Sequence, residues 1–578
     1  MDSQLLASTY RPELAPIAGS LVWSSLVALL PLLTIFITLG LLRWKAHLAG
    51  LAALAVAIAV AVAAYGMPPQ LALLSATQGA AFGLFPIMWI VFAAIWLYQI
   101  TVVSGRFEDL RAAFHLLSVD PRIQAIVIAF CFGGLLEALA GFGAPVAITG
   151  VMLMALGFSA LRAAVVVLLA NTAPVAFGAI AIPIITAGNL TGIPYTEIGA
   201  YVGRQTPLLA ALVPLLLVFL VDGRRGLRQT WPVALVTGVV FGIAQFISSN
   251  FISVELADII ASLAGLAAAA VMLKFWQPTG GDDALQRLEE EHHRELASTS
   301  PTGSSPQSGG TTTKPANKTR AIAEHAAGLT SGRVVMALFP YLLVIGVFAV
   351  AKLWDPVKEF LVGRDVKIAW PGLDGNVLTA AGKTAGSTVY NFQWLSSPGT
   401  LLVICGCVVA LVYRVSARDT IGEFVATAVK LRWAFLTVAS VLALAYVMNQ
   451  SGQTITIGTW IAGTGAAFAF LSPILGWIGT AVTGSDTSAN ALFATLQQTA
   501  AHTAGLDPTL LVAANTSGGV VGKMISPQNL TIAATAVGLL GRESDILRKV
   551  ILWSLGLLVA MCLLVGLQST PVLSWMLP

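Results

Sequence analysis

The chain has 578 residues, of which 57% are hydrophobic and only 10% are charged, and its formal net charge is +4. A soluble protein carries about 25% charged residues. This composition leaves no room for a large water-exposed domain and therefore excludes a soluble enzyme. No basic segment alternates with aromatic residues, so nucleic-acid binding has no support.

Apolar runs of membrane-spanning length follow one another along the chain. A helix of about 20 apolar residues crosses the hydrocarbon core of a bilayer, and about twelve runs approach this length. The first run is too long for the core of a cleavable signal peptide. The chain is therefore predicted to be an all-α polytopic membrane protein. The predicted spans are residues 23–42, 48–65, 86–103, 163–187, 199–221, 232–250, 255–274, 334–351, 398–413, 433–449, 509–537 and 550–568.

Two further apolar stretches, residues 122–157 and 468–504, are interrupted near their middle. The sequence GFGAP interrupts the first stretch at 141–145, and TGSDT interrupts the second at 483–487. Each half is too short to cross a membrane, so both stretches are predicted to be re-entrant hairpins. Such backbone is tolerated at membrane depth only where protein or a water-filled cavity surrounds it.

One fourteen-residue pattern occurs twice. Residues 170–183 are ANTAPVAFGAIAIP and residues 514–527 are ANTSGGVVGKMISP, an offset of 344. Small residues let helices pack closely, which explains the glycines and alanines but not a repeated Asn-Thr pair. Segments interrupted by Gly and Pro at matching places in two halves indicate a transporter's binding site. Both segments, about 163–187 and 509–537, are therefore predicted to be broken helices.

The offset also relates other spans, which predicts an N-terminal transmembrane half at 1–276 and a C-terminal half at 334–578. Residues 277–333 are polar and rich in Ser, Thr, Gly and Pro, and are predicted to be a disordered cytoplasmic linker. Loops rich in Lys and Arg lie on the cytoplasmic side. Tracing the crossings from these loops makes the two repeats inverted, as in alternating-access transporters. The loops used are those with Arg43 and Lys45, Arg224 and Arg228, Arg414 and Arg418, and Arg542 and Lys549.

Two carboxyl groups are predicted to take part in proton coupling. Glu137 lies in the first hairpin within an otherwise apolar arm, and Asp486 lies at the tip of the second. An ionisable group within the membrane is costly and is a functional candidate by default. Burial disfavours the ionised form of a carboxyl, which suits a group that must take up and release a proton. The alternative for both is a protonated carboxyl that only bonds the hairpin backbone.

A second set of residues is predicted to bind an anionic substrate. Lys523, within the second motif, could attract a substrate carboxylate or could instead neutralise Asp486. Asn and Thr side chains at broken helices, together with free backbone N–H groups, suit a small hydroxylated carboxylate, and glycines permit close approach of the backbone. The two Asn-Thr pairs are expected to face one central cavity. The predicted substrate-binding residues are Asn171, Thr172, Gly141, Gly143, Ser485, Asn515, Thr516, Ser517 and Lys523.

Four stretches of the chain closely resemble the bacterial L-lactate permease family: LLEALAGFGAPVAITG at 135–150, ANTAPVAFGAIAIPI at 170–184, TGSDTSANALFATLQ at 483–497 and AANTSGGVVGKMISPQ at 513–528. The resemblance covers nearly the whole chain except residues 277–333. It implies a multi-pass protein of the bacterial inner membrane that takes up L-lactate, with D-lactate and glycolate, by proton symport. It also implies a distant relation to transporter folds with paired hairpins.

Three other functions compete with this interpretation. Asn, Thr and backbone carbonyls at broken helices could hold Na⁺, which would make the protein a sodium-coupled carboxylate symporter. An anion channel is disfavoured by the paired hairpins and buried carboxyls. A membrane enzyme is disfavoured because the sequence shows no catalytic triad, metal-ligand cluster or phosphate loop. Neither a metal nor a cofactor is expected.

Overall fold

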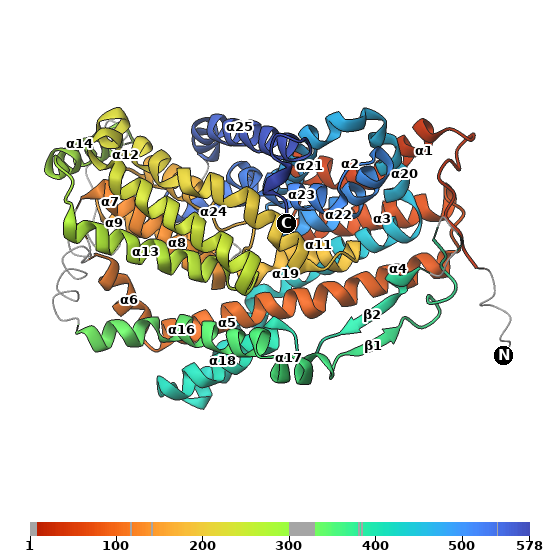
Figure 1. Ribbon diagram of the computed structural model, residues 1–578, viewed down its shortest axis with the longest axis horizontal. Helices are drawn as coiled ribbons and strands as arrows, with labels where there is room; N and C mark the ends of the chain where they lie inside the picture. The colour runs from red at the N-terminus through yellow and green to blue at the C-terminus, as the bar shows by residue number, and fades with distance from the viewer. Residues whose placement is uncertain are drawn as a thin grey trace, which may run out of the picture.

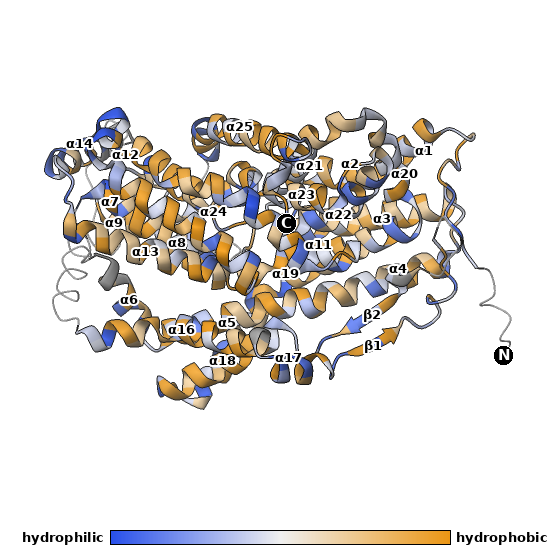
Figure 2. Cartoon of the chain, in the orientation of Figure 1, coloured by the Kyte–Doolittle hydropathy of each residue, from blue (hydrophilic) through white to orange (hydrophobic). Residues whose placement is uncertain are grey.

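The computed structural model describes residues 9–115, 118, 120–139, 143–299, 330–379, 382, 385–539 and 542–578. The described chain is a bundle of long helices with one small two-stranded sheet, as Figure 1 shows. Figure 2 shows hydrophobic residues along most of these helices and hydrophilic ones at α14 and the adjoining bend in the middle of α12. The predicted all-α polytopic membrane fold is confirmed.

The helices of the first half alternate between long spanning elements and shorter pieces. Their bounds are α1 Leu21–Ala28, α2 Leu30–Phe36, η1 Ile37–Leu41, α3 Ala46–Ala63, α4 Pro69–Phe82, η2 Gly83–Met88, α5 Trp89–Val103, α6 Arg106–His115, α7 Pro121–Gln124, η3 Ala125–Phe132, α8 Gly133–Leu139, α9 Ala144–Ala155, α10 Ala160–Ala170, η4 Ala179–Ala181, α11 Ile182–Thr191, α12 Tyr195–Ile247, η5 Ser248–Ile252, α13 Ala257–Phe275 and α14 Gly281–Thr299.

The second half has the same character and contains the sheet. Its elements are α16 Ser331–Leu353, α17 Asp355–Val362, β1 Val366–Ala369, η6 Gly386–Thr388, β2 Val389–Phe392, α18 Pro398–Val412, α19 Ala417–Gln450, α20 Gln453–Ile461, η7 Ala462–Ala467, α21 Phe468–Thr483, α22 Asp486–Ala504, α23 Pro508–Gly522, η8 Lys523–Ile525, α24 Pro527–Val537, α25 Glu543–Gln568 and η9 Ser574–Met576. The antiparallel pair β1–β2 lies in the segment 352–397, which follows the first span of this half.

Ten helices of the described chain are long and apolar enough to cross a membrane. The sequence-based number of about twelve differs because of how the chain is divided. The predicted spans 199–221 and 232–250 form one helix, α12, whose direction changes at Asp222 and Gly223. The spans 163–187 and 509–537 are each divided into pieces of 10 to 15 residues.

Both predicted hairpins are pairs of helices joined at the predicted tips. In the second, α21 ends at Gly484 and α22 begins at Asp486. Gly484 has φ 77°, a left-handed conformation that glycine adopts without strain. In the first, α7, η3 and α8 form one arm, and every residue in the arm's apolar window is buried within the protein. An arm wholly surrounded by protein does not face lipid. The arm has 19 residues, Pro121–Leu139, and is one of the helices long enough to cross a membrane, so the expectation that it is too short to do so is wrong.

Both predicted broken helices are also present, and each follows its hairpin. The first consists of α10 and α11, with non-helical backbone between them; the second consists of α23 and α24, joined by η8. A long helix, α12 or α25, comes next in each half. The same order of hairpin, broken helix and long helix is consistent with two repeats, and their inversion remains a prediction.

The expectation of a disordered linker at 277–333 is wrong for residues 281–299, which form the helix α14. The ion pairs Arg287–Asp222 and Arg162–Glu291 attach α14 to the rest of the first half. Leu288 is only 1% exposed. Acidic and apolar residues at helical spacing can thus form a docked amphipathic helix, although the composition of the whole segment suggests disorder. Residues 300–329 lie outside the described chain.

Candidate substrate and proton site

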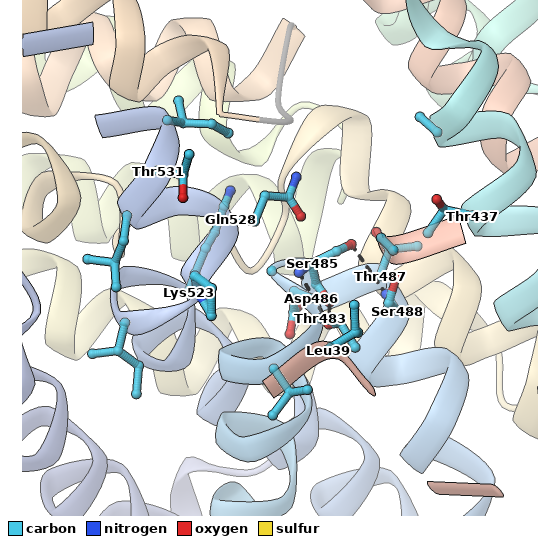
Figure 3. A pocket seen from close by; sticks show the side chains of 18 of the residues that line it. Leu39, Thr437, Thr483, Ser485, Asp486, Thr487, Ser488, Lys523, Gln528 and Thr531 are labelled. Carbon is cyan, nitrogen blue, oxygen red and sulfur yellow. Dashed lines mark hydrogen bonds between the residues drawn. The ribbon is translucent and has the colours of Figure 1, made fainter. Parts of the chain in front are cut away.

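A cavity of ≈ 1200 Å³ lies between the second hairpin and the breaks of both broken helices. Four of the predicted site residues line it: Glu137, Ser485, Asp486 and Lys523. Figure 3 shows Lys523 extended along one wall, with its amine directed away from Asp486, and Asp486 beside Thr483 and Ser485 at the tip of the second hairpin. The cavity therefore brings the buried amine of Lys523 together with the buried carboxyls of Glu137 and Asp486 in a space large enough for a small organic acid.

Glu137 and Lys523 form the central contact of this site. Lys523 Nζ lies 2.6 Å from Glu137 Oε1, and the two side chains are only 9% and 3% exposed. Asn171, at the end of α10, donates through Nδ2 to Glu137 Oε2 at 2.9 Å. Glu137 belongs to the N-terminal half and Lys523 to the C-terminal half. One ion pair thus joins the first hairpin to the second broken helix.

The burial of this pair makes its two charges interdependent. Removing one member of a buried ion pair leaves an unpaired charge, which costs about 3–5 kcal/mol, whereas the intact pair adds little net stability. Loss of the charge on Glu137 therefore frees Lys523 to accept another anion. Lys523 is bound by Glu137 and not by Asp486, which was the partner considered for it within the protein.

Asp486 is equally buried but has a different environment. Its side chain is 4% exposed, and Oδ1 accepts a hydrogen bond from Thr480 Oγ1 at 3.2 Å. Oδ2 has no hydrogen-bond partner among the described residues. The carboxyl lies against α23, where a Cβ on Gly519 would be 1.8 Å from Asp486 Oδ1. A glycine at 519 is therefore required for Asp486 to take this position.

The break in the first broken helix is strained and borders the cavity. Gly178 has φ 48° and ψ −148°, a conformation that only glycine adopts readily. Ile180 and Ala181 also have positive φ values, 50° and 57°, which are rare outside glycine and especially for a β-branched residue. Gly178 and Ala179 line the cavity. Strain of this kind persists only where the surrounding structure enforces it and is common at ligand sites.

Neither Asn-Thr pair is among the residues that line the cavity, so the expectation that both pairs face it is not met. Asn171 is connected to the cavity through its bond to Glu137, and the second pair is bonded elsewhere. Asn515 and Thr516 lie inside the continuous helix α23 and are fully buried. Asn515 Nδ2 donates to Asn490 Oδ1 at 2.9 Å, and Thr516 Oγ1 is within 3.1 Å of the same oxygen. Ser517 Oγ donates to Gln205 Oε1 at 2.6 Å. These three side chains hold α23 to α22 and α12 and do not contact the cavity.

The remaining predicted residues have structural contacts. Thr172 lies just after α10, and its Oγ1 donates to the carbonyl of Leu169 in the last turn of that helix. Gly143 begins α9 with φ 81°, and a Cβ there would be 2.4 Å from Ile532 Cδ1. The close approach at Gly143 is therefore to the second broken helix. Gly141 lies outside the described residues.

Two further buried polar residues, Asn490 and Asp258, make contacts in the structure that the sequence did not predict. Asn490 on α22 donates to the carbonyl of Pro183 at 3.2 Å and to Thr516 Oγ1 at 2.9 Å, and so links both broken helices. Asp258 on α13 is 2% exposed and accepts from Gln245 Nε2 at 2.9 Å. Asp258 could have been found by the rule that identified Glu137, because it is a carboxyl within a predicted span. Asn490 has only the weaker signal of an amide in an apolar arm.

Known proteins resemble the chain along almost its full length. The family model described as L-lactate permease matches residues 24–572. An L-lactate permease of Bacillus subtilis is 42% identical over 97% of this chain and 99% of its own. Glycolate permease GlcA of Escherichia coli is 41% identical over 93% of this chain and 94% of its own. An L-lactate permease of the same organism is 40% identical, covering 97% and 98%.

These matches and the ten membrane-length helices identify a multi-pass protein of the bacterial inner membrane. Its buried charges are arranged across two halves of the chain, in keeping with a transport protein. The chain belongs to the L-lactate permease family.

Proposed function

We propose that this protein takes up L-lactate, and also D-lactate and glycolate, together with protons, by alternating access across the inner membrane. Its relatives are named as permeases for L-lactate and glycolate. These two acids share a carboxylate beside a hydroxyl group, which is the chemistry that an amine and neighbouring hydroxyls recognise. The cavity provides both, as Lys523 and the hydroxyls of Thr483 and Ser485.

The observation that carries the proposal is the pairing of Lys523 with Glu137 at the cavity. A substrate carboxylate needs the charge of Lys523, and Glu137 occupies it at 2.6 Å. Protonation of Glu137 removes the competing charge and frees the amine for the substrate. A proton therefore enters the site with each anion, and the total charge of the buried site stays constant. A constant charge means that no unpaired charge has to be buried in the low-dielectric interior when the site moves from one side of the membrane to the other.

The walls of the cavity indicate the side from which the substrate leaves. Besides the buried residues, the cavity is lined by Arg43, Lys45 and Glu543, which lie in loops that the distribution of positive charge assigns to the cytoplasm. Near the start of α12, Tyr201 donates to Asp507 Oδ2 at 2.6 Å and so holds α12 to α23. This arrangement fits an inward-facing state in which substrate is released to the cytoplasm.

Sodium coupling is the second possibility, and one observation favours it. Asp486 Oδ2 has no partner among the described residues, and Thr480 donates to its Oδ1. A carboxylate and hydroxyl oxygens are ligands suited to a hard cation. In this version Na⁺ rather than a proton would neutralise a carboxyl of the site.

Uptake into proteoliposomes separates the two versions. Purified protein is reconstituted, and radiolabelled L-lactate is supplied with an inward proton gradient or an inward sodium gradient, each with the other cation balanced. Accumulation with the proton gradient alone is expected, and unlabelled D-lactate and glycolate should compete. Accumulation that requires sodium would overturn proton coupling. Uptake that never exceeds the equilibrium ratio under either gradient would overturn coupled transport.

A further inference from the structure

Asp486 has an unused oxygen beside the amine that the transport site depends on. It is 4% exposed, and its Oδ2 lacks a hydrogen-bond partner within the described chain. A buried ionised carboxylate without a cation is costly. Asp486 therefore carries a proton in this state, in which Lys523 is held by Glu137. Glu137, Asp486 and Lys523 together then comprise two carboxyls, one amine and one retained proton.

Asp486, the first residue of α22, packs against α23 at a place within reach of Lys523. Gly519 and Lys523 are four residues apart, so they lie on the same face of the helix. The Asp486 carboxyl rests against Gly519, where a Cβ would be 1.8 Å from Oδ1. A helical side chain covers the turn that precedes its own Cα. A change of rotamer in the flexible stem of Lys523 would therefore bring its amine from Glu137 to Asp486.

Asp486 is also suited to carry a negative charge when a cation approaches. It is the first residue of α22, and the N-terminal end of a helix favours an anion. Its contacts on α21 and α23 are the uncharged Thr480 and Gly519. The titratable and charged groups that line the cavity with it are Glu137 and Lys523, together with Arg43, Lys45, His47 and Glu543. The carboxyl can thus alternate between a neutral and an ion-paired state.

We propose that Lys523 is a two-position switch, which binds Glu137 in the state seen here and Asp486 while the unloaded protein returns to the outward-facing state. This inference rests on the proposed function. In the unloaded protein the retained proton moves from Asp486 to Glu137 through the cavity as the amine moves the opposite way. In the loaded protein both carboxyls are protonated and Lys523 binds the substrate anion. One proton therefore travels with each substrate, and the site is neutral at every stage.

The fold requires a second partner for Lys523 when the two halves of the chain move. The pair Glu137–Lys523 joins the two halves of the chain, so relative movement of the first hairpin and second broken helix separates its members. An unpaired buried ammonium would oppose that movement. Asp486 belongs to the same half as Lys523 and stays within its reach. The substrate carboxylate neutralises Lys523 while the loaded protein moves to the inward-facing state. Asp486 neutralises it while the unloaded protein returns.

The test compares exchange with net uptake, because only net uptake needs the unloaded return. In proteoliposomes, Asp486→Asn should still exchange internal for external labelled lactate, with a much smaller loss of rate than it shows in net uptake. Its initial rate of proton-driven net uptake should fall at least about tenfold, since the amide cannot neutralise the amine. Gly519→Ala keeps every charge but displaces the Asp486 carboxyl, and should show the same split. Equal losses in exchange and net uptake, or no loss in either, would overturn the switch.

A control is Asp120→Asn, which changes another buried carboxyl, 6% exposed, that pairs with Arg122 and does not line the cavity. It should leave the ratio of exchange to net uptake unchanged; if it reproduces the split, the effect is not specific to Asp486 and the switch is wrong. The wild-type protein separates this inference from the proposed function. Absence of proton-driven accumulation in the wild type overturns the proposed function, whereas its presence with an unaltered ratio in both Asp486→Asn and Gly519→Ala overturns only the switch.

Discussion

The two copies of the repeated motif share their Ala-Asn-Thr start, a Gly and a Pro but have different structures. In the first copy α10 ends at Ala170, with Asn171 as its cap, and non-helical backbone follows. In the second copy α23 continues seven residues beyond Asn515, to Gly522, and ends where Lys523 begins η8. The first copy supplies the amide that bonds Glu137, and the second supplies the amine of Lys523. A sequence repeat thus marks where a site is built without making the two sides of the site equivalent.

The glycines of the two copies illustrate the same difference. Gly178 is needed for its backbone conformation, with φ 48° and ψ −148°. Gly522 has an ordinary helical φ of −70°, and a Cβ there would be 2.3 Å from the carbonyl oxygen of Trp477. One glycine permits a break, and the other permits close packing of α23 on α21. Glycines at matching positions of the two copies therefore have two different structural roles.

The largest effect should come from removing the amine that only the second copy contains. Lys523→Ala leaves Glu137 buried without its cation, which should lower the stability of the protein by about 3–5 kcal/mol. It also removes the amine that binds the substrate carboxylate, so the KM for lactate should rise strongly. Lys523→Arg should be a poor substitute because its planar guanidinium does not fit the space of an ammonium. Adding Glu137→Gln to Lys523→Ala should restore protein abundance but not lactate affinity. Wild-type affinity in the double variant would show that the amine only balances charge.

Glu137→Gln should remove proton coupling. The amide keeps the size of the side chain and a bond to Asn171 but cannot titrate. The steady-state accumulation ratio, which for one coupled proton is about tenfold per pH unit, should fall to one, while lactate exchange continues. Proton-driven accumulation at the wild-type ratio would exclude Glu137 as the coupling group.

The two asparagines should separate function from stability. Asn171→Ala removes a hydrogen bond to a charged group, worth about 1.5–3 kcal/mol, and should both lower Tm and shift the pH dependence of uptake. Asn515→Ala breaks a buried network that includes neither Glu137 nor Lys523, and should lower Tm with an unchanged pH profile. The comparison of the two copies fails if Asn515→Ala shifts the pH profile as Asn171→Ala does.

The smallest effect concerns the threonines. Thr516→Val removes contacts with Asn490 and should lower stability by about 1 kcal/mol. Thr172→Val removes a local bond to the carbonyl of Leu169 at the end of α10 and should lower stability by less than about 0.5 kcal/mol. Thermal unfolding of the two purified variants in detergent provides the measurement, and equal losses would contradict the difference in their environments.

The sequence predicts the broad fold because its signals are local. Length and apolarity locate the spans, and the interruptions at 141–145 and 483–487 locate the hairpin tips. The importance of Glu137 and Lys523 follows from the cost of a charge in a membrane. Their pairing does not follow, because the two residues are 386 positions apart and only the packing of the halves brings them together. The same limit applies to Asn515, whose burial against Asn490 depends on how α22 lies on α23.

The helix α14 has a consequence for how the protein could be made. Its ion pairs Arg287–Asp222 and Arg162–Glu291 anchor it to the first half, so that half carries its own docked C-terminal helix up to Thr299. The second half begins its first helix at Ser331. A chain divided between these two points would leave every described element whole. Two separately translated polypeptides, 1–299 and 330–578, should therefore associate in the membrane and reconstitute transport as a two-component system.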